Sequence, residues 1–200
     1  NNLGDFESKL EEEGAGDAYD ILTRKAGTIK PGSDGLIFLP YLSGERSPYP
    51  DPYAKGCFIG LSLRHKKEHL SRSVLEGVSF GLKDSLQMMK KLGINPQEVQ
   101  LSGGGTRSTL WKQMLSDVFD LPCTMVNARE GAAYGAALLA SVGSGQFEDI
   151  ETACSAWIRK TEVISPGQHS KNYQKNYTIY QGLYPRLKET FGQIASLDDQ

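Results

Sequence analysis

Three consecutive glycines, Gly103, Gly104 and Gly105, stand between a short apolar segment and a segment with helical spacing. A strand that ends in glycines and leads into a helix is suited to bind an anion, because the first amide groups of a helix have no partner within it and carry partial positive charge. Glycines also let a ligand approach the backbone closely. The pattern is weak on its own, since it has neither the lysine of GxxxxGK[ST] nor the spacing of GxGxxG. A tight turn without a ligand would explain the same residues.

The cysteines and histidines do not have the spacing of a metal site. Cys57, Cys123 and Cys154 lie far apart in the sequence, and no CxxC pair occurs. We expect reduced, buried thiols, which are typical of a cytoplasmic protein. His65 and His69 are one helical turn apart and would suit zinc, but no third ligand is visible, so we expect surface histidines.

The composition is that of an ordinary globular protein. The 200 residues include 38% hydrophobic and 23% charged residues, and the formal net charge is -2. This balance gives no electrostatic reason to expect binding to nucleic acid or to an anionic membrane. No apolar run approaches the ~20 residues of a membrane-spanning helix. The polar, acidic beginning without a methionine indicates a fragment of a longer protein rather than a signal peptide.

Alternating strand and helix patterns predict an α/β fold. From residue 98 onward the order is strand, helix, strand, helix, which argues for a partly parallel sheet. Strands are expected at residues 36–42, 56–63, 98–102 and 122–126. Helices are expected at residues 5–27, 68–92, 130–143 and 150–157, from the glycines as far as residue 119, and in the aromatic C-terminal region.

The longest predicted helix, residues 68–92, carries an apolar stripe at helical spacing. Gly93 follows the helix at the position of a C-terminal cap. Gly77 and Gly81 lie one turn apart, and because an interior glycine costs ~1 kcal/mol, we expect close packing there. The residues expected to form the buried stripe are Leu70, Val74, Val78, Leu82 and Met89.

Aromatic residues spaced along the C-terminal region predict core packing rather than a ligand site. Pro185 lies within this region and is expected to kink or split the helix. The spaced residues are Tyr173, Tyr177, Tyr180, Tyr184, Leu187 and Phe191.

Four segments, in order and over most of the chain, resemble the C-terminal domain of the FGGY carbohydrate kinases. GLIFLPYLSGERSPYPDPYAKGCFIGLS at residues 35–62 is similar to the segment that enters this domain. GCFIGL together with HLSRSVLE, which ends at Glu76, is similar to a signature of the family. LSGGGTRSTLWKQMLSDVFDLP at residues 101–122 resembles the adenine-nucleotide loop and its helix. EGAAYGAALLA at residues 130–140 resembles the helix that closes the site.

The resemblance implies an RNase H-like α/β fold, as in actin, hexokinase and Hsp70-type ATPases, with a mixed sheet flanked by helices. Residues 1–200 would form the C-terminal, nucleotide-binding domain. The sugar-binding N-terminal domain and the first strands of the C-terminal domain would lie upstream of Asn1. ATP and Mg2+ would bind between the two domains, and the γ-phosphoryl group of ATP would pass to a sugar hydroxyl.

The same resemblance implies which residues of this chain contact the nucleotide. Gly103, Gly104 and Gly105 would form the floor beneath it, and the hydroxyls of Thr106 and Ser108 would contact it. Capping of the following helix is the alternative role of the two hydroxyls.

Four further residues are candidates for the cleft between the domains: Glu45, Arg46, Glu130 and Gly131. An ion pair that pins the loop is the alternative for the first two, and helix packing is the alternative for the others. No residue is assigned to catalysis or to a metal, because the family's catalytic aspartate would lie upstream of Asn1. We therefore expect the chain alone to be inactive, and to form a homodimer through an exposed sheet edge.

Two other classes of protein stay open. A regulatory nucleotide-binding module would be favoured by a DNA-binding appendage or a basic face, and the sequence has neither. Half of a Rossmann-type dehydrogenase would be favoured by an acidic residue at the end of the next strand, where Asn127 stands.

Overall fold

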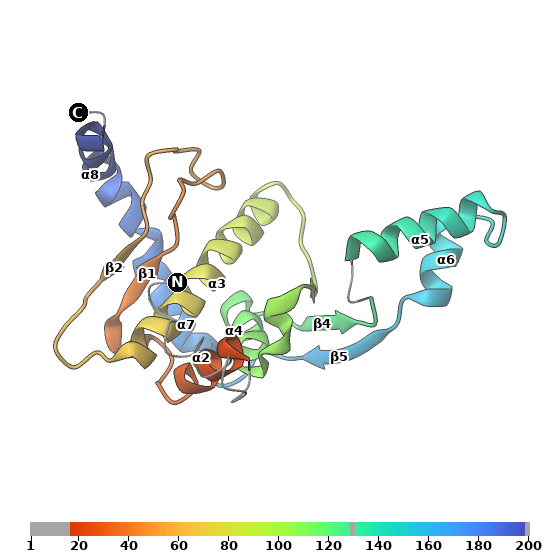
Figure 1. Cartoon of the computed structure of the whole chain (residues 1–200), viewed down its shortest axis with the longest axis horizontal. Helices are drawn as coiled ribbons and strands as arrows, with labels where there is room; N and C mark the ends of the chain where they lie inside the picture. Colours follow the sequence, from red (N-terminus) through yellow and green to blue (C-terminus); the bar gives the residue numbers. More distant parts are fainter. Residues whose placement is uncertain (1–16, 129–130, 199–200) are drawn as a thin grey trace.

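The computed structural model describes residues 17–128 and 131–198, and it combines several helices with short strands (Figure 1). The helices are α2 (Ala18–Ala26), α3 (Lys67–Lys91), α4 (Thr109–Phe119), α5 (Gly131–Gly143), α6 (Ile150–Trp157), α7 (Ser170–Gln181) and α8 (Leu183–Asp198). Two short 3-10 helices are η1 (Ser33–Gly35) and η2 (Gly104–Arg107). The helix predicted for residues 5–27 begins at Ala18, and its earlier part lies outside the described residues.

The strands form two small sheets. β1 (Ile37–Leu39) pairs antiparallel with β2 (Cys57–Ile59). In the second sheet, β3 (Val99–Leu101) runs parallel to β4 (Cys123–Val126), which pairs antiparallel with β5 (Lys160–Ile164). The parallel pair joined through α4 confirms the predicted strand–helix–strand unit. β5 was not predicted and makes the sheet mixed.

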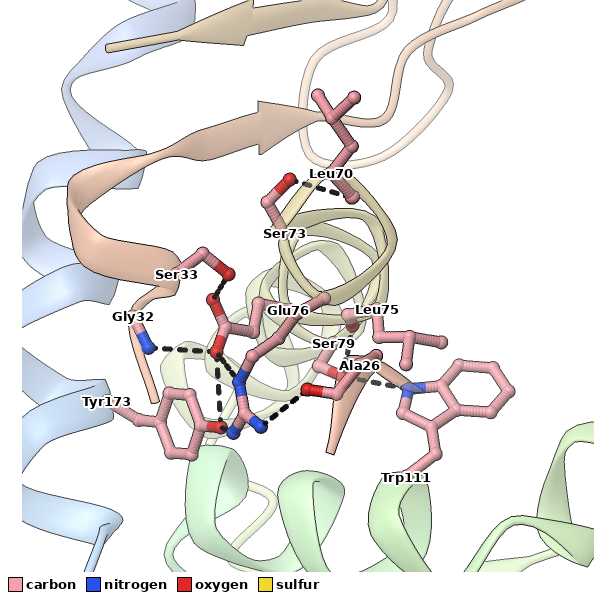
Figure 2. A network of polar contacts seen from close by, with 11 residues as sticks. Ala26, Gly32, Ser33, Leu70, Ser73, Leu75, Glu76, Ser79, Trp111 and Tyr173 are labelled. Atoms are coloured by element: carbon pink, nitrogen blue, oxygen red, sulfur yellow. Dashed lines mark hydrogen bonds and ion pairs between the residues drawn. The ribbon is translucent and has the colours of Figure 1, made fainter. Parts of the chain in front are cut away.

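α3 lies at the centre of the molecule. It contacts β1, α2, α4 and α7. Figure 2, a view along the axis of α3, shows β1 on one side of the helix and α4 on the other. The expected close packing occurs at Gly77, where a Cβ atom would lie 2.2 Å from the carbonyl oxygen of Phe38. A Cβ at Gly81 would make only ordinary contacts.

The predicted buried stripe of α3 is wrong. Leu82 and Met89 are 47% and 44% exposed, and Leu70, Val74 and Val78 are only partly buried. Because α3 is covered on more than one side, its buried surface includes many polar positions. The buried residues are His69, Arg72, Ser73, Leu75, Glu76, Gly77, Ser79, Phe80, Lys83, Asp84 and Leu86.

A buried ion pair joins α3 to the segments before and after it (Figure 2). The Arg72 Nε atom donates to Glu76 Oε1 at 2.8 Å, and both side chains are almost fully buried. The Glu76 carboxylate also accepts from the Gly32 amide at 2.8 Å and from the Ser33 hydroxyl at 2.9 Å. Arg72 Nη2 donates to the Tyr173 hydroxyl at 2.8 Å. The pair thus connects η1, α3 and α7.

His69 is not the surface residue that the sequence predicts. It is 8% exposed, its Nδ1 atom accepts from the Lys66 amide at 3.1 Å, and its Nε2 atom lies 3.3 Å from Asp34 Oδ2. An Nδ1 acceptor places the proton of the neutral ring on Nε2, where it can be donated to the carboxylate. His69 therefore fixes the start of α3 against η1.

Lys83 is a second buried charge of α3. Its ammonium group donates to the carbonyl of Val118 at 2.6 Å and to the side chain of Gln174, and it lies 4.6 Å from the centre of the Tyr177 ring. Burial lowers the pKa of Lys83 to about 8. The neutral amine retains two N–H donors, so both hydrogen bonds survive deprotonation.

Raising the pH is expected to increase the contribution of Lys83 to the free energy of unfolding. An unfolded lysine titrates near 10.5, so between about pH 8 and 10.5 the unfolded chain binds more protons than the folded chain, and this group adds stability as the pH rises. Relative to Lys83→Met, the unchanged chain should gain about 1 kcal/mol in free energy of unfolding between about pH 7.5 and 9.5. Urea unfolding at several pH values measures this gain. The control Lys160→Met removes an exposed lysine, and an equal gain against it would contradict the prediction.

The C-terminal aromatic residues pack in the core as predicted. Five of the six spaced residues are at most 5% exposed, and Leu187 packs against them. The helical region divides at Gly182, not at Pro185. Pro185 stands in the first turn of α8, where a missing amide proton costs no helical hydrogen bond.

α5 and α6 pack against each other at the far end of β4 and β5, away from the other helices (Figure 1). Within the described ranges, no helix combines the length and apolar character needed to cross a membrane. The three cysteines are free thiols, and of these only Cys123 is fully buried.

Candidate functional site: a glycine-floored cavity

Each of the three glycines after β3 occupies its position for a different physical reason. Gly103 has φ 91° and ψ 175°, a backbone conformation that essentially only glycine adopts. Gly104 has ordinary angles and open space beside it, because a Cβ atom there would meet no atom within 4 Å. A Cβ at Gly105 would lie 1.9 Å from the ring of Trp111. The turn thus requires one unusual backbone angle, one close packing contact and one bare, open position.

The ring of Trp111 packs against the glycine loop at Gly105. Its indole nitrogen donates to the hydroxyl of Ser79 on α3 at 3.0 Å (Figure 2). The ring is partly buried and packs against the hydrophobic core. The glycine loop therefore rests on an indole that is fixed to the central helix.

A cavity of about 840 Å³ opens over the carboxyl ends of β3 and β4. Ligands of open α/β sheets bind in this place, and the volume is in the range of ~300–1,000 Å³ usual for small-molecule sites. Gly103 and Gly104 lie in its floor. The cavity is lined by Leu101, Ser102, Gly103, Gly104, Thr106, Arg107, Lys112, Met125, Val126, Ala128, Thr161 and Glu162.

The two predicted hydroxyls have different positions. Thr106 lines the cavity, and its hydroxyl donates to the carbonyl of Gly103 at 2.6 Å, which braces the loop. Ser108 is 6% exposed and does not line the cavity. Its hydroxyl accepts from the Trp111 amide at 3.2 Å and caps α4. The sequence allowed Ser108 either to contact a nucleotide or to cap the helix, and its geometry is that of a helix cap.

Three charged residues are part of the cavity's lining. Arg107 is exposed at the end of the glycine loop. The Lys112 ammonium on α4 forms an ion pair with the Glu162 carboxylate on β5. Among the described residues that line the cavity, Glu162 has the one carboxylate, and Lys112 donates to it.

The fit of this cavity to Mg2+ is poor. Protein-bound Mg2+ takes one or two carboxylates together with phosphate oxygens and water. The carboxylate of Glu162 is already bound to Lys112. In the part of the chain that the structure describes, no group of three acidic, histidine or cysteine side chains is placed to hold a metal. The described residues around this cavity therefore offer Mg2+ no free carboxylate.

Of the four candidate cleft residues, the three that the structure describes, Glu45, Arg46 and Gly131, do not line the cavity. Glu45 Oε1 accepts from the backbone amides of Arg46 at 2.7 Å and Ser47 at 2.9 Å. The structure shows no Glu45–Arg46 ion pair, the alternative role of these residues, among the described residues. The Glu45 carboxylate instead accepts hydrogen bonds from two amides of its own loop. Gly131 begins α5 and does not line the cavity, and Glu130 lies outside the described residues.

Several lining residues were missed at the level of sequence. The sequence pattern places Lys112 in a helix and assigns it no role. It lies in the first turn of α4, close enough to the glycines to line the same cavity. Thr161 and Glu162 come from the unpredicted strand β5. The alternation in KTEVI, with β-branched residues at every second position, is the signal that could have found this strand.

The fold and the cavity place the chain among α/β proteins with a ligand site beyond the carboxyl ends of parallel strands. Residues 3–144 match the FGGY family of carbohydrate kinases, C-terminal domain. A xylulose kinase of Staphylococcus epidermidis is 33% identical over 182 residues, which are 90% of this chain and 37% of that protein. A gluconokinase of Bacillus subtilis is 37% identical over 181 residues, 90% of this chain and 35% of that protein.

The structural similarity agrees with the sequence similarity. The crystal structure of ligand-bound xylulose kinase from Lactobacillus acidophilus has a TM-score of 0.80 and 29% identity, over 86% of this chain and 35% of that one. The chain belongs to the FGGY family of carbohydrate kinases and matches its C-terminal domain. The predicted RNase H-like fold class is confirmed. The chain spans little more than a third of the length of these relatives.

Proposed function

We propose that this chain is the nucleotide-binding domain of an ATP-dependent sugar kinase. The observation that carries the proposal is the open glycine floor: Gly103 and Gly104 leave bare backbone in the lining of a cavity beside the start of α4. Bare backbone and a helix N-terminus suit the phosphates of a nucleotide. The exposed guanidinium of Arg107 adds positive charge at the same edge.

The chain's own part in phosphoryl transfer is positioning. Such transfer depends on holding the nucleotide and on neutralising its charge, and it also needs a group that accepts the hydroxyl proton. The Glu162 carboxylate is tied to Lys112 and is a poor candidate for that base. We propose that the base, the Mg2+ ligands and the sugar contacts belong to parts of the kinase outside these 200 residues. The chain alone should then show no turnover.

The proposed sugar is D-xylulose, with D-xylulose 5-phosphate as the product. The xylulose kinase of S. epidermidis supports this choice, and the gluconokinase of B. subtilis makes gluconate the second candidate. A coupled assay on the complete kinase that contains this chain should give a higher kcat/KM for D-xylulose than for gluconate. The reverse order would assign the chain to a gluconate kinase.

A methyl group on the floor of the cavity is expected to weaken nucleotide binding without unfolding the chain. A Cβ at Gly104 contacts nothing within 4 Å, so Gly104→Ala should leave the free energy of unfolding within about 0.5 kcal/mol of the unchanged chain. The methyl occupies space that the proposed ATP needs, so the affinity for ATP should fall about tenfold. Amide chemical shifts in an NMR titration with ATP measure the affinity.

Gly192→Ala on α8 is the matched control, since a Cβ there also meets open space but lies outside the cavity. This control should keep the affinity of the unchanged chain. Equal affinities for all three proteins would contradict nucleotide binding at the glycine floor.

A cytoplasmic location and a homodimer are further proposals. Free thiols at Cys57, Cys123 and Cys154 support a reducing compartment. β3 is an edge strand of its sheet, which supports self-association. Light scattering across concentrations tests the dimer.

A further inference from the structure

The lining of the cavity includes an ion pair between two separate elements of the fold. Lys112 extends from α4 and Glu162 from β5, and the two side chains meet in the lining of the cavity. The side chain of Lys112 is 12% exposed and that of Glu162 is 45% exposed. The pair is therefore sheltered at the lysine end and accessible at the carboxylate end.

The pair offers a donor and an acceptor to a ligand. An ammonium group has three N–H donors, and one of them is engaged with Glu162 Oε2. Among the described residues, no second acceptor contacts Lys112 Nζ and no donor contacts Glu162 Oε1. A ligand group at this place can accept from the lysine and donate to the carboxylate.

This combination fits a ligand group that both donates and accepts hydrogen bonds. A phosphate only accepts hydrogen bonds and is repelled by the carboxylate. The edge of adenine offers its amino group as a donor and N7 as an acceptor, but 2′-deoxy-ATP keeps that edge, so a difference in affinity between ATP and 2′-deoxy-ATP reports the hydroxyls. A hydroxyl both donates and accepts, and two adjacent hydroxyls can engage both side chains. The phosphates have a better place over the glycines and near Arg107.

We propose that Lys112 and Glu162 bind the vicinal 2′ and 3′ hydroxyls of the nucleotide's ribose, and so select ribonucleotides over 2′-deoxyribonucleotides. This inference rests on the proposed nucleotide site. It assigns α4 and β5 a role in specificity, in addition to the glycine loop between β3 and α4.

The test is an NMR titration of the 200-residue chain with ATP and with 2′-deoxy-ATP, following the amides of Gly103 and Gly104. The unchanged chain should bind ATP about tenfold more tightly, because a hydrogen bond to a charged group has an effect of this size. In Lys112→Met and in Glu162→Gln, the ratio of the two affinities should fall, mainly through weaker binding of ATP, and it should reach about one in the variant whose side chain contacted the 2′ hydroxyl.

Lys160→Met is the matched control. Lys160 lies two residues from Glu162 on β5 and forms an exposed ion pair with Glu98 outside the cavity. It should keep the tenfold preference. If the Lys112–Glu162 pair only ties α4 to β5, both variants will weaken both nucleotides equally and leave the ratio unchanged, which overturns the inference.

Two other outcomes separate this inference from the proposed function. Equal affinity of the unchanged chain for the two nucleotides overturns the ribose assignment and leaves nucleotide binding intact. Absence of binding to either nucleotide at millimolar concentration overturns the nucleotide site of this chain and the inference with it.

Discussion

Replacing Glu76 by alanine is expected to lower the free energy of unfolding by about 3–5 kcal/mol. The substitution leaves the guanidinium of Arg72 buried without its carboxylate. It also removes the acceptor of the Gly32 amide and the Ser33 hydroxyl. A buried charge without a partner is far more costly than the net stability of the intact pair. Urea unfolding monitored by circular dichroism measures the loss.

Two controls separate the buried charge from the loss of packing. The double substitution Arg72→Met with Glu76→Leu removes both charges, so it should recover much of the lost stability. Glu98→Ala breaks the exposed pair with Lys160 and should cost no more than about 1 kcal/mol. Equal losses for Glu76→Ala and Glu98→Ala would show that the network in Figure 2 adds nothing beyond a surface pair.

The glycine junction shows what local sequence can predict. A strand, three glycines and a helix predict an unusual turn or room for a ligand at the backbone, and the structure has the unusual angle at Gly103 and open space at Gly104. The reason for Gly105 lies in its contact with Trp111, six residues further along the chain. The sequence predicted either a nucleotide contact or a helix cap for the Ser108 hydroxyl, and the start of α4 had to be known before the two could be distinguished.

The buried face of α3 could not be predicted from hydropathy. A helix covered on one side buries one apolar stripe, whereas α3 has neighbours on several sides. Some of its buried polar residues have partners far away in the sequence: Glu76 accepts from Ser33, and Lys83 donates to Val118. Such partners are a property of the fold, and no window of sequence contains them.

β5 and the charged pair in the cavity escaped prediction for a related reason. The strand is short and largely exposed, so its one signal is the alternation of the β-branched residues Thr161 and Val163, which is weaker than the apolar alternation of a half-buried strand. Glu162 reaches Lys112 only because β5 pairs antiparallel with β4 beside α4. Fifty residues separate the two side chains, and the chain between them forms α5 and α6. A pair of side chains that come from two distant elements can be identified only when the fold is known.

Gly77→Ala is expected to cost about 3 kcal/mol of stability, although alanine is the better helix former by ~1 kcal/mol. The new Cβ would lie 2.2 Å from the carbonyl oxygen of Phe38, which belongs to backbone and cannot rotate away. α3 would have to move away from β1, yet it also packs against α2, α4 and α7. Thermal and urea unfolding measure the loss.

Gly81→Ala, one turn further along α3, is the matched control. The nearest atoms to its Cβ would be Tyr180 Oη at 3.5 Å and Pro40 Cγ at 3.7 Å, which are ordinary contacts. This variant should therefore gain up to about 1 kcal/mol from helix propensity. The two substitutions have the same chemistry on the same helix, so opposite signs can arise only from the contact with β1. A stabilising Gly77→Ala would mean that α3 and β1 are further apart in solution than the structure places them.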